Sequence, residues 1–246
     1  MAYIWNPKMM GSGMAACIPQ KGKCPNNCEE CFFQSGRGYL EPLETNTPNM
    51  PHVAVGKNLV IRVNDGNDSN YQKLLVLQAT RRYPLKFFNT SIPNLNFPAP
   101  VVLTVNPGAM TDTDAHLICN PPPNLMFVRF RTNTWNLDLA KSVVSFYSDR
   151  GVPIVLTFMA YANLPQPKAC GDYQWRKRTM NTYYAISYES WKEIMHQHRN
   201  NLSVYSCSGP DVALCRHCGN CLREYWATRE RMWRSVNHLG QPFKEQ

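Results

Sequence analysis

The chain has 246 residues, of which 43% are hydrophobic and 17% are charged. This composition excludes a wholly disordered chain, and the length is enough for one large α/β domain or for a domain with a small appendage. No apolar run approaches the roughly 18 residues of a membrane helix, and residues 1–14 lack the apolar centre of a signal peptide. We therefore expect a cytoplasmic protein with no membrane partner. The formal net charge of +9 is compatible with an anionic partner such as a nucleic acid.

Short β-type runs alternate with helical patterns and turn signals along the chain. The predicted strands are residues 14–18, 59–64, 85–89, 101–106, 125–131 and 154–159. The predicted helices are residues 70–82, 137–150, 191–199 and 222–239. Strands that alternate with helices in this way are typical of an α/β domain.

Three cysteines follow the first predicted strand with the spacing CxxxCxxC. They are Cys24, Cys28 and Cys31, and no fourth thiol lies beside them in this loop. Cysteines two or three residues apart rarely bridge each other, so in a reducing compartment they are expected to bind a metal. A structural zinc ion takes four ligands, whereas an iron–sulfur cubane held by three cysteines leaves one iron open. The spacing favours the open iron–sulfur site, with structural zinc as the alternative.

This motif near the N-terminus resembles that of the radical S-adenosylmethionine (radical SAM) superfamily. The resemblance implies that the three cysteines hold a [4Fe-4S] cluster whose open iron binds the amino and carboxylate groups of SAM. It also implies an α/β fold, a partial (β/α)6 TIM-like barrel, which we assign to residues 1–165. Many members carry an aromatic residue just before the last cysteine, which packs against adenine. Here that position is Glu30, and Phe32 or Phe33 would replace it.

A second group of cysteines lies near the C-terminus. Its members are Cys207, Cys215, Cys218 and Cys221, the last three with the spacing CxxCxxC. Four thiolates close a metal site, either as a fully coordinated [4Fe-4S] cluster or as a zinc site. Consecutive two-residue gaps make a poor pair of zinc knuckles, and many radical SAM enzymes resemble this layout in carrying an auxiliary cluster. We assign residues 166–246 to a small cysteine-rich extension with a second [4Fe-4S] cluster, zinc being the alternative.

Polar residues alternate with apolar ones in several predicted strands. If Ile61 and Val63 face the helices, strand parity places a polar row on the inner face of the barrel. This row comprises Arg62, Asn64, Thr104, Asn106, Arg129, Arg131, Thr157, Met159 and Tyr161. Barrels of this kind build their sites at the carboxyl ends of their strands.

The resemblance then implies roles for part of this row. An arginine fork suits a carboxylate, so Arg129 or Arg131 is predicted to bind the SAM carboxylate. Thr104 and Asn106 are candidates for the ribose hydroxyls, and Met159 is a further candidate for SAM binding.

The loop after the second predicted strand reads Asn64-Asp65-Gly66-Asn67-Asp68. Many radical SAM enzymes carry a Gly-Gly-Glu-type turn here, whose backbone binds the amino group of SAM. The resemblance makes Asn64, Asp65 and Gly66 candidates for this contact. An ordinary Asp-Gly turn before a helix is the alternative.

The resemblance also implies a reaction and a redox partner. A reduced cluster cleaves SAM to methionine and a 5'-deoxyadenosyl radical, which abstracts hydrogen from a substrate; amino-acid side chains alone do not supply such chemistry. An electron donor such as a flavodoxin or a ferredoxin is implied. The substrate stays open between a peptide or protein, a small metabolite and an RNA. Basic and aromatic residues in 175–178 and 222–239 suit RNA, although helical spacing also explains them.

The alternative function is that of a non-catalytic zinc protein. Both cysteine groups would then be structural, and the basic C-terminal region would bind a nucleic acid or a partner protein. A brown protein would favour iron–sulfur, and a colourless one that retains zinc would favour this alternative.

Overall fold

The structure is a computed structural model of the chain. It describes residues 2–26, 28, 39–40, 45, 48–107, 117–161, 171–177, 182–207 and 214–238. Among the helices that it describes, none has an apolar stretch of the length needed to cross a membrane.

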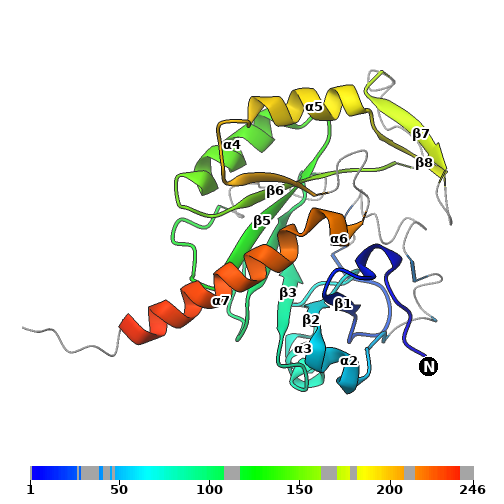
Figure 1. Cartoon of the computed structure of the whole chain (residues 1–246), viewed down its shortest axis with the longest axis vertical. Helices are drawn as coiled ribbons and strands as arrows, with labels where there is room; N and C mark the ends of the chain where they lie inside the picture. Colours follow the sequence, from blue (N-terminus) through cyan, green and yellow to red (C-terminus); the bar gives the residue numbers. More distant parts are fainter. Residues whose placement is uncertain are drawn as a thin grey trace, which may run out of the picture.

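Seven parallel strands form one sheet that curls into a half-barrel (Figure 1). The strands, in their order across the sheet, are β1 (Met14–Cys17), β2 (Val60–Val63), β3 (Lys86–Thr90), β4 (Val101–Val105), β5 (Leu125–Thr132), β6 (Ile154–Phe158) and β9 (Val204–Cys207). Each strand pairs with the next one of this order in parallel register. This regular order confirms the α/β fold and is consistent with a partial barrel.

Helices cover the outer face of the sheet. They are α2 (Val53–Asn58), α3 (Lys73–Thr80), α4 (Leu137–Ser148) and α5 (Tyr188–Gln197). The outer core joins strand residues such as Ile61, Leu103 and Leu156 to helix residues such as Val143 and Ile194. Parallel sheets bury both faces, so the inner face needs a cover as well.

Helix α7 (Asn220–His238) provides that inner cover, together with the short helices α6 (Cys215–Cys218) and η1 (Pro7–Met9). Tyr225 of α7 is 1% exposed, and its ring lies 6.2 Å from that of Phe87. Arg231 donates hydrogen bonds to the backbone oxygens of Pro123 at 3.1 Å and Leu125 at 2.6 Å. The C-terminal half of α7 is thereby fixed to the amino end of β5.

An antiparallel hairpin, β7 (Tyr173–Lys177) and β8 (Thr182–Ile186), lies in the connection between β6 and β9. Ser187 follows β8 and caps α5, because its side chain accepts a hydrogen bond from the backbone N–H of Ser190. The chain then returns to the sheet as β9. Strand β9 belongs to the segment that we assigned to the extension, yet it pairs with β6 in the same sheet.

All six predicted strands and all four predicted helices are confirmed, with ends that differ by up to three residues. Strand β9, the hairpin and α2 were not predicted. The predicted parity fails at Met159 and Tyr161, which belong to the outer core. Strand β6 ends at Phe158, and the alternation of a strand does not continue past its end.

We predict that the inner cover depends on Tyr225. Replacing it with Ala leaves a cavity against Phe87, so Tyr225→Ala should lower the free energy of unfolding by about 3–5 kcal/mol, as measured by denaturant titration. Its neighbour Trp226 is 48% exposed and is the matched control. Trp226→Ala should cost far less, and equal losses in the two variants would contradict this packing.

Candidate functional site

The inner face of the sheet changes from apolar to polar along β2, β3, β4, β5, β6 and β9, whereas the inward residues of β1, Met14 and Ala16, are both apolar. Two successive inward residues, taken from the amino to the carboxyl end, are Val60 and Arg62, Phe87 and Asn89, Val102 and Thr104, Phe127 and Arg129, Val155 and Thr157, and Tyr205 and Cys207. The first member of each pair belongs to the inner core or packs against it. The carboxyl half of the half-barrel is therefore lined by groups that bind polar ligands, as the predicted parity requires.

Arg129 lies near the middle of this polar layer. Its Nη1 donates to Oδ1 of Asn89 at 3.2 Å and to Oγ1 of Thr104 at 3.4 Å. Burial lowers the pKa of Arg129, and the positive charge of Arg62 lowers it further. Arg129, one of the two arginines predicted for the SAM carboxylate, is half-buried, and so is Arg62. The two cations repel each other, an arrangement that favours an anion between or beside them.

Arg62 is paired with the loop that follows its strand. Its Nη2 lies 3.0 Å from Oδ1 of Asp65, and Nδ2 of Asn6 donates to the other oxygen of that carboxylate. Burial lowers the pKa of Arg62. Negative charge raises it by more, so the net shift is upward; this charge comes from Asp65 and from Cys221, Cys215 and Cys207. The side chain of Asp65, a predicted SAM-binding residue, already has two partners.

Several buried polar atoms of this layer have no hydrogen-bond partner among the residues that the structure describes. They are Nε of Arg62, Oδ1 of Asn64, both polar side-chain atoms of Asn106 and Oγ1 of Thr157. Buried polar groups in folded proteins almost always have partners. Asn106, which follows β4 and is 1% exposed, therefore marks a position where a polar ligand or water is expected.

The first cysteine loop starts at the carboxyl end of β1. Nδ2 of Asn26, between Cys24 and Cys28, donates to Oδ2 of Asp68 at 3.0 Å and to Oγ of Ser91 at 2.8 Å. These partners follow β2 and β3, so the described part of the loop lies against the polar end of the sheet. Cys31 and Phe32, two further predicted site residues, lie outside the described residues.

Asp68 connects three segments at this end of the sheet. Its carboxylate, 3% exposed, also accepts hydrogen bonds from the N–H of Asn70 and the hydroxyl of Thr90, both at 2.8 Å, and from the N–H of Ser91 at 2.7 Å. Hydrogen bonds to a buried charged group are among the stronger ones in proteins. Asp68 therefore holds the cysteine loop, the β2–α3 loop and the end of β3 together.

The backbone of the β2–α3 loop adopts the geometry of a tight turn. Asn64 has a φ of 62° and Gly66 a φ of 134°, conformations that favour asparagine and glycine. The loop thus forms the turn that the sequence predicts, but its contact with a ligand stays a prediction.

The second cysteine group lies at the β9 edge of the sheet, whereas the first cysteine loop follows β1 at the opposite edge. Cys207 ends β9 beside Thr157 of β6, Cys215 and Cys218 are the ends of α6, and Cys221 lies in the first turn of α7. Cys207, Cys215 and Cys221 pack against the inner core. The fold thus brings Cys207, Cys215 and Cys221 to the inner core, although the sequence spreads the group over 15 positions.

Burial has the largest effect on the pKa of the Cys215 and Cys221 thiols. It raises the pKa of Cys215 to about 12 and also raises that of Cys221, and in both cases Arg62 is the first charge that opposes it. No three His, Cys, Asp or Glu side chains of the described segments lie close enough together to hold a metal ion. The second cysteine group is therefore not arranged as a metal site in this structure, although Cys207, Cys215 and Cys221 have the positive charge of Arg62 as a neighbour.

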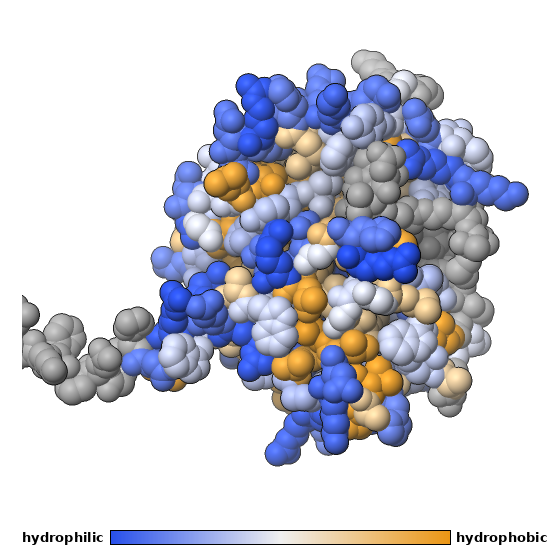
Figure 2. All heavy atoms as spheres, in the orientation of Figure 1, coloured by the Kyte–Doolittle hydropathy of each residue, from blue (hydrophilic) through white to orange (hydrophobic). Residues whose placement is uncertain are grey.

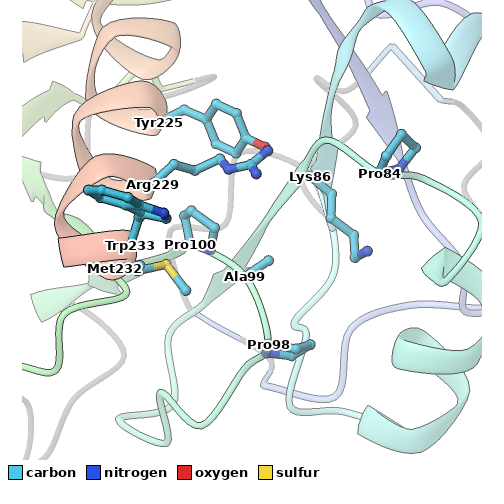
Figure 3. A pocket seen from close by; sticks show the side chains of 9 residues that line it. All are labelled: Pro84, Lys86, Pro98, Ala99, Pro100, Tyr225, Arg229, Met232 and Trp233. Carbon is cyan, nitrogen blue, oxygen red and sulfur yellow. The ribbon is translucent and has the colours of Figure 1, made fainter. Parts of the chain in front are cut away.

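A separate groove of about 310 Å³ lies at the opposite end of the sheet (Figure 3). It is lined by Pro84, Lys86, Pro98, Ala99, Pro100, Tyr225, Arg229, Met232 and Trp233. Figure 2 shows apolar side chains gathered between α7 and the first strands, next to hydrophilic ones. The groove is remote from the polar layer, because its strand residue Lys86 begins β3.

Comparison of the chain with models of protein families, with curated proteins and with solved structures found no match. The function of the site therefore has to be argued from its own residues.

Sequence reasoning missed two parts of this site. Asn89 has the parity of the inner row, and extending the alternation to β3 would have found it. The role of Asp68 depends on partners from three loops, and a single sequence carries no signal for such contacts.

We predict that Asp68→Asn loosens the first cysteine loop. The amide nitrogen cannot accept the hydrogen bonds that one carboxylate oxygen accepts, so Cys24 and Cys28 should react faster with iodoacetamide, by several-fold, as followed by mass spectrometry. Cys119 is exposed and far along the chain, and its unchanged rate is the internal control. Equal labelling rates for Cys24 and Cys28 in wild type and variant would show that Asp68 does not hold the loop.

Proposed function

We propose that the chain is a radical SAM enzyme. The observation that carries the proposal is the position of the described part of the CxxxCxxC loop, which follows the first strand of a curled parallel sheet and is bound through Asn26 to loops at the carboxyl end of that sheet. Ligand sites of open and closed parallel barrels occur at this end. Cys24, Cys28 and Cys31 would hold the first cluster, and its open iron would bind SAM.

The bound cluster and SAM would supply the reductive cleavage of SAM and hydrogen abstraction from the substrate. The protein's own contribution is to bind, orient and shield. Arg129 uses one of its nitrogens for Asn89 and Thr104, which leaves other N–H donors of the guanidinium for a carboxylate. Thr104 and Asn106 lie along the same strand and its end, where the resemblance suggests the ribose.

Shielding from water is provided at the amino end of the half-barrel. Leu222 of α7 packs so close to Gly13 that a Cβ there would lie 3.2 Å from its Cδ2, and Tyr225 fills the space against Phe87. Exclusion of water from a site prevents side reactions of a reactive intermediate. The closed amino half and the polar carboxyl half support such a site.

The proposal also includes an electron donor, a location, candidate substrates and an auxiliary cluster. A flavodoxin or a ferredoxin would supply the electron, and the protein would act in the cytoplasm. A peptide or protein, a small metabolite and an RNA remain the candidate substrates. The second cysteine group would hold an auxiliary [4Fe-4S] cluster.

The first test is cleavage of SAM. Anaerobically reconstituted and reduced protein should convert SAM to 5'-deoxyadenosine, slowly and without substrate, as measured by chromatography. Replacing Cys24, Cys28 and Cys31 together with Ala should abolish the product, because the open iron is lost with its ligands. Cys119→Ala, which removes an exposed thiol, is the matched control and should retain activity.

Iron content completes this test. Wild-type protein should bind about eight irons and the triple variant about four, since each cubane contains four. Continued SAM cleavage by the triple variant would contradict the proposal. A colourless wild-type protein that retains zinc would support the non-catalytic alternative.

The second test concerns the SAM carboxylate. If Arg129 binds it, Arg129→Met should weaken SAM binding about 10- to 150-fold, since a charge-assisted pair contributes about 1.5–3 kcal/mol. Lys at this position should restore only part of the affinity, because it lacks the planar fork. Arg131→Met is compared in the same calorimetric titration, and unchanged affinity in both variants would assign the carboxylate to another group.

A further inference from the structure

Helix α7 carries two tryptophans that its packing against the sheet leaves exposed. Tyr225 and Thr228 are 1% and 0% exposed, whereas Trp226 is 48% and Trp233 is 67% exposed. Helical spacing therefore explains the buried aromatic residue, but not the two exposed ones. Positions seven apart lie on the same side of a helix and about 10 Å from each other. Trp226 and Trp233 thus form an aromatic stripe on the surface of α7.

Trp233 also lines the groove at the amino end of the sheet. Figure 3 shows Arg229 and the other α7 side chains on one side of this groove and Lys86 on the other. Arg229 is exposed, and its guanidinium carbon lies 6.0 Å from the ring centres of both Tyr225 and Trp226. The residues that line the groove include two cations and no acid. The groove therefore combines aromatic surface with positive charge.

Positive charge continues beside the groove. Arg81 and Arg82 are exposed and precede the groove residue Pro84 by three and two positions, which keeps them within about 11 Å of it along the chain. Residues 69–111 contain no Asp or Glu, so no acid of this segment offsets these charges. The groove and its border are therefore complementary to a partner rich in negative charge.

Single-stranded RNA is the partner whose chemistry these features match. RNA presents unpaired bases in its loops and bulges, and such bases stack on aromatic rings and arginine planes, while a basic groove attracts the phosphates. An acidic protein segment would use the cations, but it would leave the rings of Trp226 and Trp233 without planar partners. Glu230, an acid near this stripe, is already paired with Arg234.

We propose that the groove and the aromatic stripe of α7 form a binding surface for single-stranded RNA, with bases stacked on Trp226 and Trp233 and phosphates near Arg229. The groove lies at the opposite end of the sheet from the polar layer, so RNA bound here is held away from the proposed SAM site. The inference goes beyond the proposed function and does not depend on the cleavage of SAM.

The test measures binding of an oligouridine of about 12 nucleotides to the full chain by fluorescence anisotropy; single-strand sites span about 4–16 nucleotides. Trp233→Ala should weaken binding about 5- to 150-fold, the effect of one lost base–aromatic stack. Trp233→Phe should restore most of the affinity. Tyr188→Ala is the matched control, because Tyr188 is 42% exposed and belongs to α5 on the outer face of the sheet. Its affinity should equal that of the wild type.

Salt dependence separates stacking from charge. The logarithm of the affinity falls with the logarithm of the salt concentration, with a slope of about 0.7 for each neutralised phosphate of a single strand. Arg229→Met should reduce this slope by about 0.7. Trp233→Ala should lower the affinity without changing the slope. Both side chains are exposed, so neither change should alter folding.

The possible results decide the inference. A wild type that does not bind oligouridine, or binding by Trp233→Ala and Arg229→Met as tight as that of Tyr188→Ala, would overturn it. Equal affinity for an RNA duplex of the same length would also overturn it, because paired bases cannot stack on the tryptophans. Equally tight binding of an oligoglutamate of the same charge would overturn it in favour of an acidic protein. Failure of the wild type to cleave SAM would count against the proposed function alone, since this surface needs neither cluster nor SAM.

Discussion

A parallel sheet needs an apolar cover on both faces, and in this chain the inner cover determines where the site lies. Helix α7 fills the amino half of the curl with Tyr225 and is fixed there by Arg231, which binds the backbone at the start of β5. The direction of α7 follows from these contacts. Its first turn, with Cys221, points to the polar half of the inner face, so Cys221 comes near Arg62 and Arg129, as Cys207 at the end of β9 does.

A second constraint acts on the first cysteine loop. Its spacing is a local property of the sequence, but its position over the sheet depends on the carboxylate of Asp68, which binds Asn26 together with Thr90 and Ser91. Asp68 is buried and fully occupied by these contacts, so it is better suited to hold the loop than to bind a ligand. In the same β2–α3 loop, Asp65 is committed to Arg62 and Asn6.

The strands and the polar row were predictable because both depend on local patterns. Alternation in β2 and β5 places Ile61 and Phe130 in the outer core, and hence Arg62 and Arg129 on the inner face. The same rule fails at Met159, since it holds only within a strand. Strand β9 was missed because Val204–Cys207 is short and carries little alternation. The contacts of Asp68 and the approach of Cys221 to Arg62 are long-range, and no period of the sequence encodes them.

The polar half of the inner face lowers the stability of the ligand-free protein. Asn106 and Thr157 bury polar atoms that no described residue satisfies, and each such group opposes folding by about 1–3 kcal/mol. Arg62 and Arg129 add two half-buried cations, of which Arg62 is paired with Asp65. The outer core and the packing of α7 offset this cost, so the fold tolerates a layer that is poorly satisfied on its own. Such a layer is stabilised when an anionic and hydrogen-bonding ligand occupies it, because binding to the folded state alone favours folding.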